Sequence, residues 1–397
     1  MNCLKNRHAN LFIIFPLLSV LIFSNCTGQQ HTELRTAVQA KLDEICQGSE
    51  FPGATLGIVL DDNTELIFVT GLSDVENNIP MKPSDRMFTG SQGKTFVAGL
   101  MMQLHDEKKL SLDDRISKYL GDEEWFSRIP NHEVLTVRML MHHTGGLPRY
   151  VFKPAFIEAL TTTPDKTYKP EELLSFIFDD PPMHEPDKGW AYSDTDFIII
   201  GMIIEKICGS TYYSELEKRI LKPFKLKDTI PSDRKVLPGL IPGYTADKAA
   251  PFFLPEKVQV DGELVLNPQF EWCGGGLITT SMDLARWAKL LYEAKVFSQE
   301  SLNEMLKPVN FRTGQPDETG YGLGVFIFDT PSGIVYGHHG VFPGYETAMF
   351  YLPEEQIGIA LQINADSSSG KLNKQITHYL FSEIIPVIKE NLDQNKD

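Results

Sequence analysis

A serine and a lysine, Ser91 and Lys94, are the residues of this chain best suited to covalent chemistry. In a helix, side chains at positions i and i+3 lie on one face, so Lys94 can reach the Ser91 hydroxyl. A lysine stripped of water loses its proton more easily and can then activate a serine near neutral pH. The pair therefore predicts a Ser91 nucleophile with Lys94 as its proton acceptor. The same residues also fit a serine that caps an ordinary core helix.

The Ser-x-x-Lys spacing occurs three times, and the surroundings distinguish the copies. Ser232–Lys235 lies between two prolines in a stretch without helical periodicity, and Ser368–Lys371 lies in a Ser/Gly-rich turn. Only Ser91–Lys94 opens a continuous apolar run, over 96–102. Because a helix that is apolar all round is usually buried, this copy is the one whose lysine would lose its water.

Two further segments carry groups suited to proton transfer or ligand approach. Tyr192-Ser193-Asp194 precedes an apolar helix predicted over 197–208, and Gly337-His338-His339-Gly340 ends a strand predicted over 334–338. A tyrosine beside a cation can titrate, and a glycine on a strand edge lets a ligand approach the backbone. Read alone, Tyr192 is more typical of a core aromatic residue than of a catalytic one.

The paired histidines His142-His143 and His338-His339 raise the alternative of a metallohydrolase. Adjacent residues on a strand point to opposite faces, and no spaced cluster of histidines and carboxylates accompanies either pair. We therefore expect no metal site, and we expect His143 to be a structural hydrogen-bonding residue. Metal-dependent activity would be the sign of the alternative class.

The elements that must position these residues predict an α+β fold. Apolar runs over 54–60 and 65–71, joined by Asp61-Asp62-Asn63-Thr64, are typical of a hairpin. Later strands are predicted over 321–328, 334–338, 347–352 and 357–363, and helices over 34–46, 282–294 and 372–390, with a kink at Pro386. This order predicts one antiparallel sheet built from both chain ends and flanked by helices, about 31–98 and 265–397. A mostly helical lobe, about 99–264, is inserted between them.

The first 25 residues are typical of an export signal. Lys5 and Arg7 precede an apolar run over 11–23 that contains Pro16 and is too short to span a bilayer. Cys26 follows directly, which resembles a bacterial lipoprotein cleavage site, although Asn25 stands where a small residue is usual. We expect a lipid-anchored periplasmic or cell-surface protein whose mature domain covers 26–397 and whose contact with the membrane is the lipid alone.

Charge and composition exclude several classes of function. The chain has 37 basic and 53 acidic side chains, a net charge of −16, and no basic patch or glycine-rich phosphate loop. Nucleic acid is therefore not an expected partner. An apolar content of 42% supports a packed globular protein.

Three motifs together carry a resemblance to a known family. Ser91-Gln92-Gly93-Lys94, Tyr192-Ser193-Asp194 and His338-His339-Gly340 come in the order found in the serine β-lactamase and penicillin-binding protein superfamily. The chain resembles in particular the class C-like branch, which includes D,D-peptidases, D-aminopeptidases and esterases. Supporting stretches lie at 135–138, 143–147, 223–229 and 274–277, and the resemblance covers about 54–364.

The resemblance implies a role for each matching residue and no cofactor. Ser91 would be acylated, Lys94 would take or share its proton, and Tyr192 would relay protons to the leaving group. His338 would line the cleft from the strand edge, and Gly340 would keep that edge open. The backbone N–H groups of Ser91 and Val341 would form the oxyanion hole.

One departure from the family pattern concerns the substrate. Asp194 stands where the superfamily has asparagine, and an ionised aspartate cannot donate a hydrogen bond to a substrate amide. We read this as favouring a substrate ammonium group or a plain ester. Amide, β-lactam and ester substrates, including peptidoglycan-like peptides, all stay open, as does the oligomeric state. The alternatives are a slowly deacylating penicillin-binding protein and a non-catalytic cell-wall-binding lipoprotein on the same fold.

Overall fold

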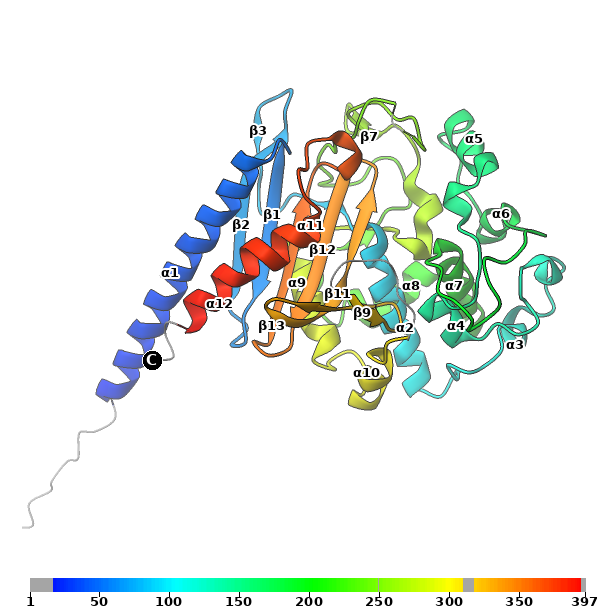
Figure 1. Cartoon of the computed structure of the whole chain (residues 1–397), viewed down its shortest axis with the longest axis horizontal. Helices are drawn as coiled ribbons and strands as arrows, with labels where there is room; N and C mark the ends of the chain where they lie inside the picture. The colour runs from blue at the N-terminus through cyan, green and yellow to red at the C-terminus, as the bar shows by residue number, and fades with distance from the viewer. Residues whose placement is uncertain (1–16, 249, 310–317, 394–397) are drawn as a thin grey trace, which may run out of the picture.

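The centre of the molecule is an eight-stranded antiparallel sheet, seen in a computed structural model that describes residues 17–248, 250–309 and 318–393 (Figure 1). Its strands, in spatial order, are β3 (Ile79–Pro80), β2 (Glu65–Asp74), β1 (Gly53–Val59), β13 (Ile357–Ile363), β12 (Tyr345–Leu352), β11 (Gly333–Phe342), β10 (Phe326–Thr330) and β9 (Glu318–Tyr321). The pairing of β1 with β13 joins the two ends of the chain, so the predicted α+β class with one antiparallel sheet is confirmed.

Two predicted strands differ from the observed ones. The strand expected over 321–328 is two strands, because the chain turns between Tyr321 and Phe326 and the Gly322 N–H bonds to the Val325 carbonyl. The strand expected over 334–338 continues to Phe342, which pairs with Tyr345 of β12. Glycines in β11 weaken the apolar alternation on which the prediction depended, while the pairing with β12 sustains the strand.

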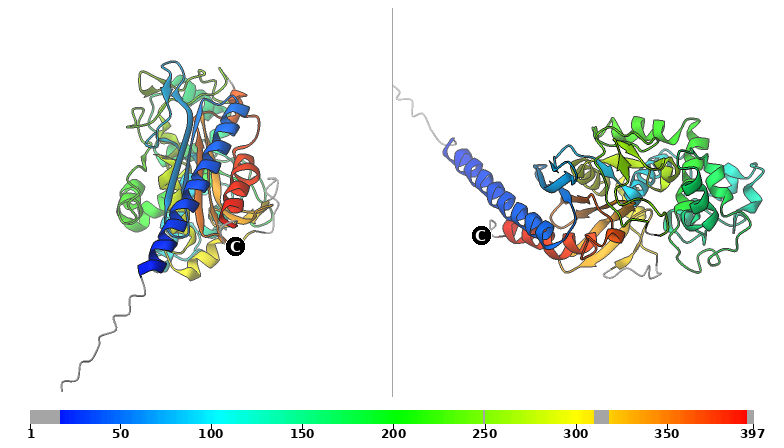
Figure 2. Two further views of the ribbon diagram at one scale, coloured as in Figure 1. Left: turned by 90° about the vertical axis from the view of Figure 1, so that its left-hand side faces the viewer. Right: turned by 90° about the horizontal axis from the view of Figure 1, so that it is seen from above.

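Terminal helices cover one face of the sheet. Helix α1 (Leu17–Gly48) lies beside α12 (Ile385–Asp393), and both pack with the sheet into one apolar cluster (Figures 1 and 2). The closing helix begins with α11 (Ile376–His378), and a π-helical segment, Tyr379–Ile384, comes before α12. That wide turn precedes Pro386, which has no N–H to donate to a regular helix.

The predicted export signal lies mostly outside the described residues. Residues 1–16 are not among them, and Cys26 falls within the span of α1. In the part of the chain that the structure describes, no helix is both long and apolar enough to cross a membrane. Export and lipidation stay predictions.

The other face of the sheet carries α9 (Ser281–Tyr292), which packs against β1 and β13. Central strands β1, β12 and β13 are buried along their whole length because helices cover both faces. Behind α9 lies α2 (Gly93–Asp106): the Trp287 ring stacks on Phe96 at 4.4 Å, and its Nε1 donates to Thr95 Oγ1.

Helices α3 (Ser117–Leu120) to α8 (Tyr212–Leu216) gather at the end of the molecule away from α1 (Figure 2). The longest of them, α7 (Asp194–Cys208), contacts α2, α4 (Val137–His142) and α6 (Pro170–Ser175). It begins three residues before the predicted start at 197, which places Asp194 and Asp196 in its first turn.

Candidate active site

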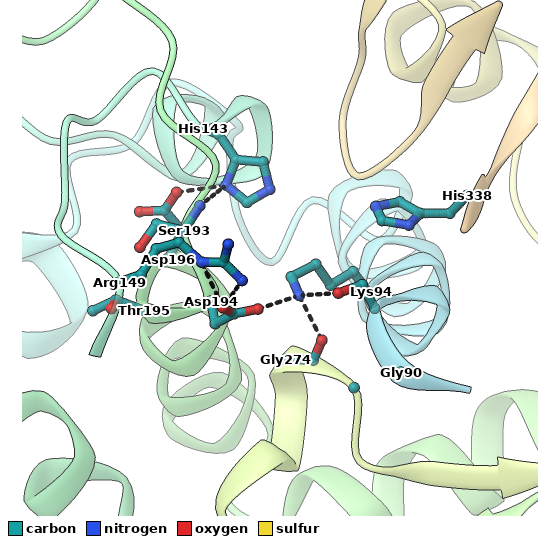
Figure 3. Close-up of polar contacts among 12 residues, drawn as sticks. Gly90, Lys94, His143, Arg149, Ser193, Asp194, Thr195, Asp196, Gly274 and His338 are labelled. Atoms are coloured by element: carbon teal, nitrogen blue, oxygen red, sulfur yellow. Dashed lines mark hydrogen bonds and ion pairs between the residues drawn. The ribbon is translucent and has the colours of Figure 1, made fainter. Parts of the chain in front are cut away.

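Ser91 lies in a 3₁₀ turn, η1 (Gly90–Gln92), that runs directly into α2. Lys94, in the first turn of α2, is fully buried, and its Nζ lies 3.2 Å from Ser91 Oγ. Lys94 Nζ also donates to the Gly274 carbonyl at 2.6 Å and to Asp194 Oδ1 at 2.7 Å (Figure 3). The lysine head group is therefore held by three oxygens from three separate segments.

Close backbone packing explains the glycine at position 93. A Cβ on Gly93 would lie 1.8 Å from the Gly275 carbonyl oxygen, which no side chain could accommodate. The absence of that atom lets the 274–276 segment pack against the start of α2 and present the Gly274 carbonyl to Lys94. The 274–276 segment therefore packs closely against the start of α2 and also supplies a hydrogen-bond acceptor to Lys94.

The other two Ser-x-x-Lys copies have their lysines paired elsewhere. Lys235 Nζ binds Asp165 at 2.7 Å and Glu263 at 2.9 Å, and Lys371 Nζ binds Glu256 at 2.7 Å. The Ser-x-x-Lys spacing alone therefore does not bring a lysine to a serine. The contact between Ser91 and Lys94 also needs the helix that follows Ser91.

Asp194 lies between two cations. Its Oδ1 accepts from Lys94, and its Oδ2 accepts from Arg149 Nε at 3.0 Å and Nη2 at 2.7 Å (Figure 3). Burial alone would raise the pKa of this carboxyl, but Arg149 and Lys94 hold it well below its usual range. Since both oxygens already bind protein cations, the reading of Asp194 as a site for a substrate ammonium loses its basis.

The charge of Lys94 corrects a second expectation. Burial by itself lowers the pKa of this lysine, as the sequence analysis assumed, but Asp194 and Tyr192 outweigh burial and raise it. Lys94 is consequently an ammonium group at neutral pH and donates its proton toward Ser91. The expectation of a resting neutral base is wrong, because no local pattern reveals that a carboxylate 100 residues away pairs with this lysine.

Tyr192 lies beside the lysine. The Lys94 ammonium is 4.9 Å from the centre of its ring, and its buried hydroxyl interacts with the side chains of Lys94 and Ser91. Burial raises the pKa of Tyr192, while Lys94 acts in the opposite direction. A buried phenol next to an ammonium can exchange a proton with it, so Tyr192 and Lys94 titrate as a pair.

A buried histidine–aspartate pair packs against Tyr192. His143 Nδ1 lies 2.6 Å from Asp196 Oδ2, and the His143 ring is 4.4 Å from that of Tyr192. Burial holds the pKa of His143 well below its usual value, so the ring is neutral. No group of three potential metal-ligating side chains comes together in the described ranges.

Strand β11 forms the opposite wall. His338 Nε2 lies 3.2 Å from the Tyr321 hydroxyl, its Nδ1 lies 2.5 Å from the His339 carbonyl, and burial keeps its pKa well below the ordinary value. A Cβ on Gly340 would lie 2.9 Å from the Ser91 amide nitrogen, and one on Gly90 would lie 2.6 Å from that of Val341. The Gly90–Ser91 and Gly340–Val341 backbones are therefore in close contact, and the oxyanion-hole role of the Ser91 and Val341 amides stays a prediction.

A cleft of about 510 Å³ opens above Ser91 between these walls. Val341 and Phe152 are half exposed at its rim, and much of its lining is apolar: Val151, Trp190, Phe252, Leu254, Phe270, Phe326 and Pro343. Three charged lining residues escaped sequence analysis: Arg149, Glu271 and Asp366. Each is a single ionisable residue without a spacing pattern, so no signal in the sequence could have identified them.

The fold and the Ser91–Lys94–Tyr192 arrangement together define a serine hydrolase of the β-lactamase and penicillin-binding protein type. The sequence profile of the Beta-lactamase family matches residues 38–380. The chain belongs to this family.

Known relatives agree with this assignment. Penicillin-binding protein 4* of Bacillus subtilis (strain 168) is 25% identical over 340 residues, covering 82% of this chain and 72% of that protein. A D-stereospecific amidohydrolase from Streptomyces sp. superposes with a TM-score of 0.74 at 27% identity, covering 88% of this chain and 98% of the other. The D-amino acid amidase from Ochrobactrum anthropi SV3 complexed with D-phenylalanine gives 0.74 at 25% identity, covering 91% and 99%.

Proposed function

We propose that this protein hydrolyses an amide bond of a small peptide or amide that contains a D-amino acid, through an acyl-enzyme on Ser91. The observation that carries the proposal is Ser91 Oγ, which lies 3.2 Å from the buried Lys94 ammonium in a cleft that Val341 also lines. The D-amino acid preference is supported by the two structural relatives named for it, at 25% and 27% identity.

The reaction follows from the positions of these groups. Loss of one proton from the Lys94–Tyr192 pair creates a base that accepts the Ser91 proton as Oγ bonds to the substrate carbonyl carbon. The backbone amides of Ser91 and Val341 stabilise the oxyanion, and the accepted proton passes to the leaving amine as the C–N bond breaks. Water then attacks the Ser91 ester, giving the free acid and restoring the hydroxyl.

Mass spectrometry of the intact protein mixed with a penicillin, and product analysis with D-phenylalanine amide, test the proposal. We expect a mass increase or product formation that Ser91→Ala abolishes. Ser368→Ala is the matched control, since Ser368 also precedes a lysine by three positions and lines the same cleft. A lasting adduct without turnover favours the second candidate, a slowly deacylating penicillin-binding protein. Absence of reaction in every tube contradicts both.

We also propose that the chain is exported and lipidated at Cys26. The support is the charged, apolar and cysteine-containing order of residues 5–26. Metabolic labelling with an alkyne fatty acid should mark the wild type and Cys46→Ser but not Cys26→Ser. Equal labelling of all three proteins contradicts the proposal.

A further inference from the structure

The charges around Ser91 and Arg149 do not balance. Asp366 also lines the cleft, where its carboxylate accepts hydrogen bonds from the Gly344 and Ser369 N–H groups and from the Ser368 hydroxyl. Lys94 and Arg149 are two cations on the one carboxylate of Asp194. The histidines nearby are neutral, because burial holds the pKa of His143 and His338 well below the usual value. This end of the cleft therefore carries a net positive charge, inside a chain whose net charge is −16.

Glu271 does not cancel this charge at neutral pH. It lines the cleft, and its buried Oε2 has no hydrogen-bond partner in the described part of the chain. Burial raises the pKa of Glu271 to about 8, with Lys94 acting against burial. Its carboxyl group is therefore mostly protonated near pH 7.

One nitrogen of the Arg149 guanidinium can still donate to a ligand. Nε and Nη2 hold Asp194, whereas Nη1 donates no hydrogen bond within the described ranges and points away from that carboxylate (Figure 3). The guanidinium lies 4.3 Å above the Phe152 ring and 5.2 Å from the Tyr192 ring, which fixes its plane at the cleft wall. About a third of the side chain is exposed, so a ligand in the cleft can reach it.

We infer that Arg149 is a specificity-determining residue that binds a carboxylate of the substrate next to the scissile bond. A guanidinium anchored on one edge presents its remaining N–H groups in a fixed direction, and carboxylates are the groups that such a fork binds best. The paired Asp194 thereby takes on a different task from the asparagine of relatives: it orients a cationic donor. This inference rests on the proposed hydrolase function and adds a preference for those substrates that carry a carboxylate.

Paired chromogenic esters test the inference. The first pair is mono(4-nitrophenyl) adipate and the same ester with its free carboxylate replaced by a carboxamide. The two esters differ only in this group, on the acyl side. The second pair, 3-carboxyphenyl and 3-carbamoylphenyl hexanoate, places the carboxylate on the leaving group. We expect the wild type to prefer the acid of one pair by about 10-fold in kcat/KM, equivalent to about 1.4 kcal/mol.

Variants assign the preference to Arg149. Arg149→Gln should reduce the acid-to-amide ratio to about 1, Arg149→Lys should retain part of it, and added salt should weaken it. Because the ratio compares two substrates on one enzyme, it is insensitive to a general loss of activity. Arg128→Gln is the matched control: Arg128 also holds one carboxylate, Asp179, through Nε and Nη2, and lies over an aromatic ring, Phe178, but outside the cleft.

The outcomes separate this inference from the hydrolase proposal. Ser91-dependent hydrolysis whose ratio is unchanged by Arg149→Gln overturns the role of Arg149 and leaves the hydrolase standing. A second readout is the calorimetric binding of adipic acid monoamide, which keeps one carboxylate, to Ser91→Ala. If that binding requires Arg149 while no variant hydrolyses any ester, the carboxylate site stands and the hydrolase function fails. If adipic acid monoamide binds equally well without Arg149, the proposed carboxylate site is wrong.

Discussion

At the scale of single residues, Asp194 determines the electrostatics of the site. It keeps Lys94 protonated through one hydrogen bond and holds Arg149 at the cleft wall through two. A resting ammonium cannot accept the Ser91 proton, so the enzyme depends on losing one proton from the Lys94–Tyr192 pair. Activity should therefore increase as the pH rises above neutral.

Replacing the carboxylate tests this dependence. In Asp194→Asn, the main group that raises the pKa of Lys94 is gone, so a larger fraction of the lysine is unprotonated at a given pH. We expect the alkaline rise of kcat/KM to move to lower pH by about one unit. A pH–rate profile measures it, with Asp179→Asn as the control. An unmoved profile would show that Lys94 is not the titrating group.

Glu271 should make the anionic preference depend on pH. Its pKa of about 8 means that it gains a negative charge in the alkaline range. Lys94 loses its proton at higher pH than Glu271, because the pKa of Lys94 is raised, and Asp194 stays ionised because its pKa is held low. The acid-to-amide ratio of the esters should therefore fall by about threefold or more as the pH rises through 8.

The corresponding variant is Glu271→Gln, measured with the same ester pairs. Its acid-to-amide ratio should stay constant from neutral to alkaline pH, because no carboxyl group at this position can ionise. The carboxamide ester of each pair is the internal reference for changes in rate that are common to both esters. A ratio that falls equally in the wild type and in Glu271→Gln would assign the titration to another group.

At the scale of elements, the junction of η1 with α2 places the nucleophile. The junction depends on the contact between Gly93 and the Gly275 backbone, which brings the Gly274 carbonyl to Lys94. Backbone atoms cannot rotate away as a side chain can, so the contact tolerates no added atom.

Gly93→Ala should therefore destabilise the protein by about 1–3 kcal/mol, in the range of overpacked cores, and reduce turnover. The φ of Gly93 is −53°, which alanine adopts freely, so the effect would come from packing alone. Thermal unfolding and kcat measure the two effects. Gly48→Ala is the control, since nothing lies within 4 Å of the Cβ it would add. Equal melting temperatures for the two variants would contradict the packing argument.

At the scale of the whole molecule, the sheet and the nucleophile helix are joined through α9. Trp287 is completely buried, stacks on Phe96 of α2 and donates to Thr95. The strands beneath α9 come from both chain ends, so this side chain couples the first and last parts of the sequence to Ser91.

Trp287→Ala should reduce the free energy of unfolding by about 3–5 kcal/mol, as expected for a large buried aromatic residue. It should also lower activity, because α2 loses its support. Denaturant titration measures the first effect, and Trp125→Ala, at a partly exposed tryptophan in the helical lobe, is the control. A loss as small as that of the control would mean that α9 and α2 are held together by other contacts.

Much of the fold could be predicted from local patterns. The strand over 357–363 was predicted with its observed bounds, and the helix over 282–294 agrees with α9 within two residues at each end. Apolar periodicity and turn residues encode such elements directly. The break between β9 and β10 and the extension of β11 were missed, because pairing with neighbouring strands determines them.

The sequence by itself determined which residues could form the site. Ser91 and Lys94 are neighbours because helix geometry relates positions three apart, whatever the rest of the chain does. Only the tertiary structure decided the charge of Lys94, the pairing of Asp194 and the presence of Arg149 and Glu271 in the cleft. The physical reason is that a pKa depends on burial and on charges within a few ångströms, and here those charges come from distant segments that folding brings together.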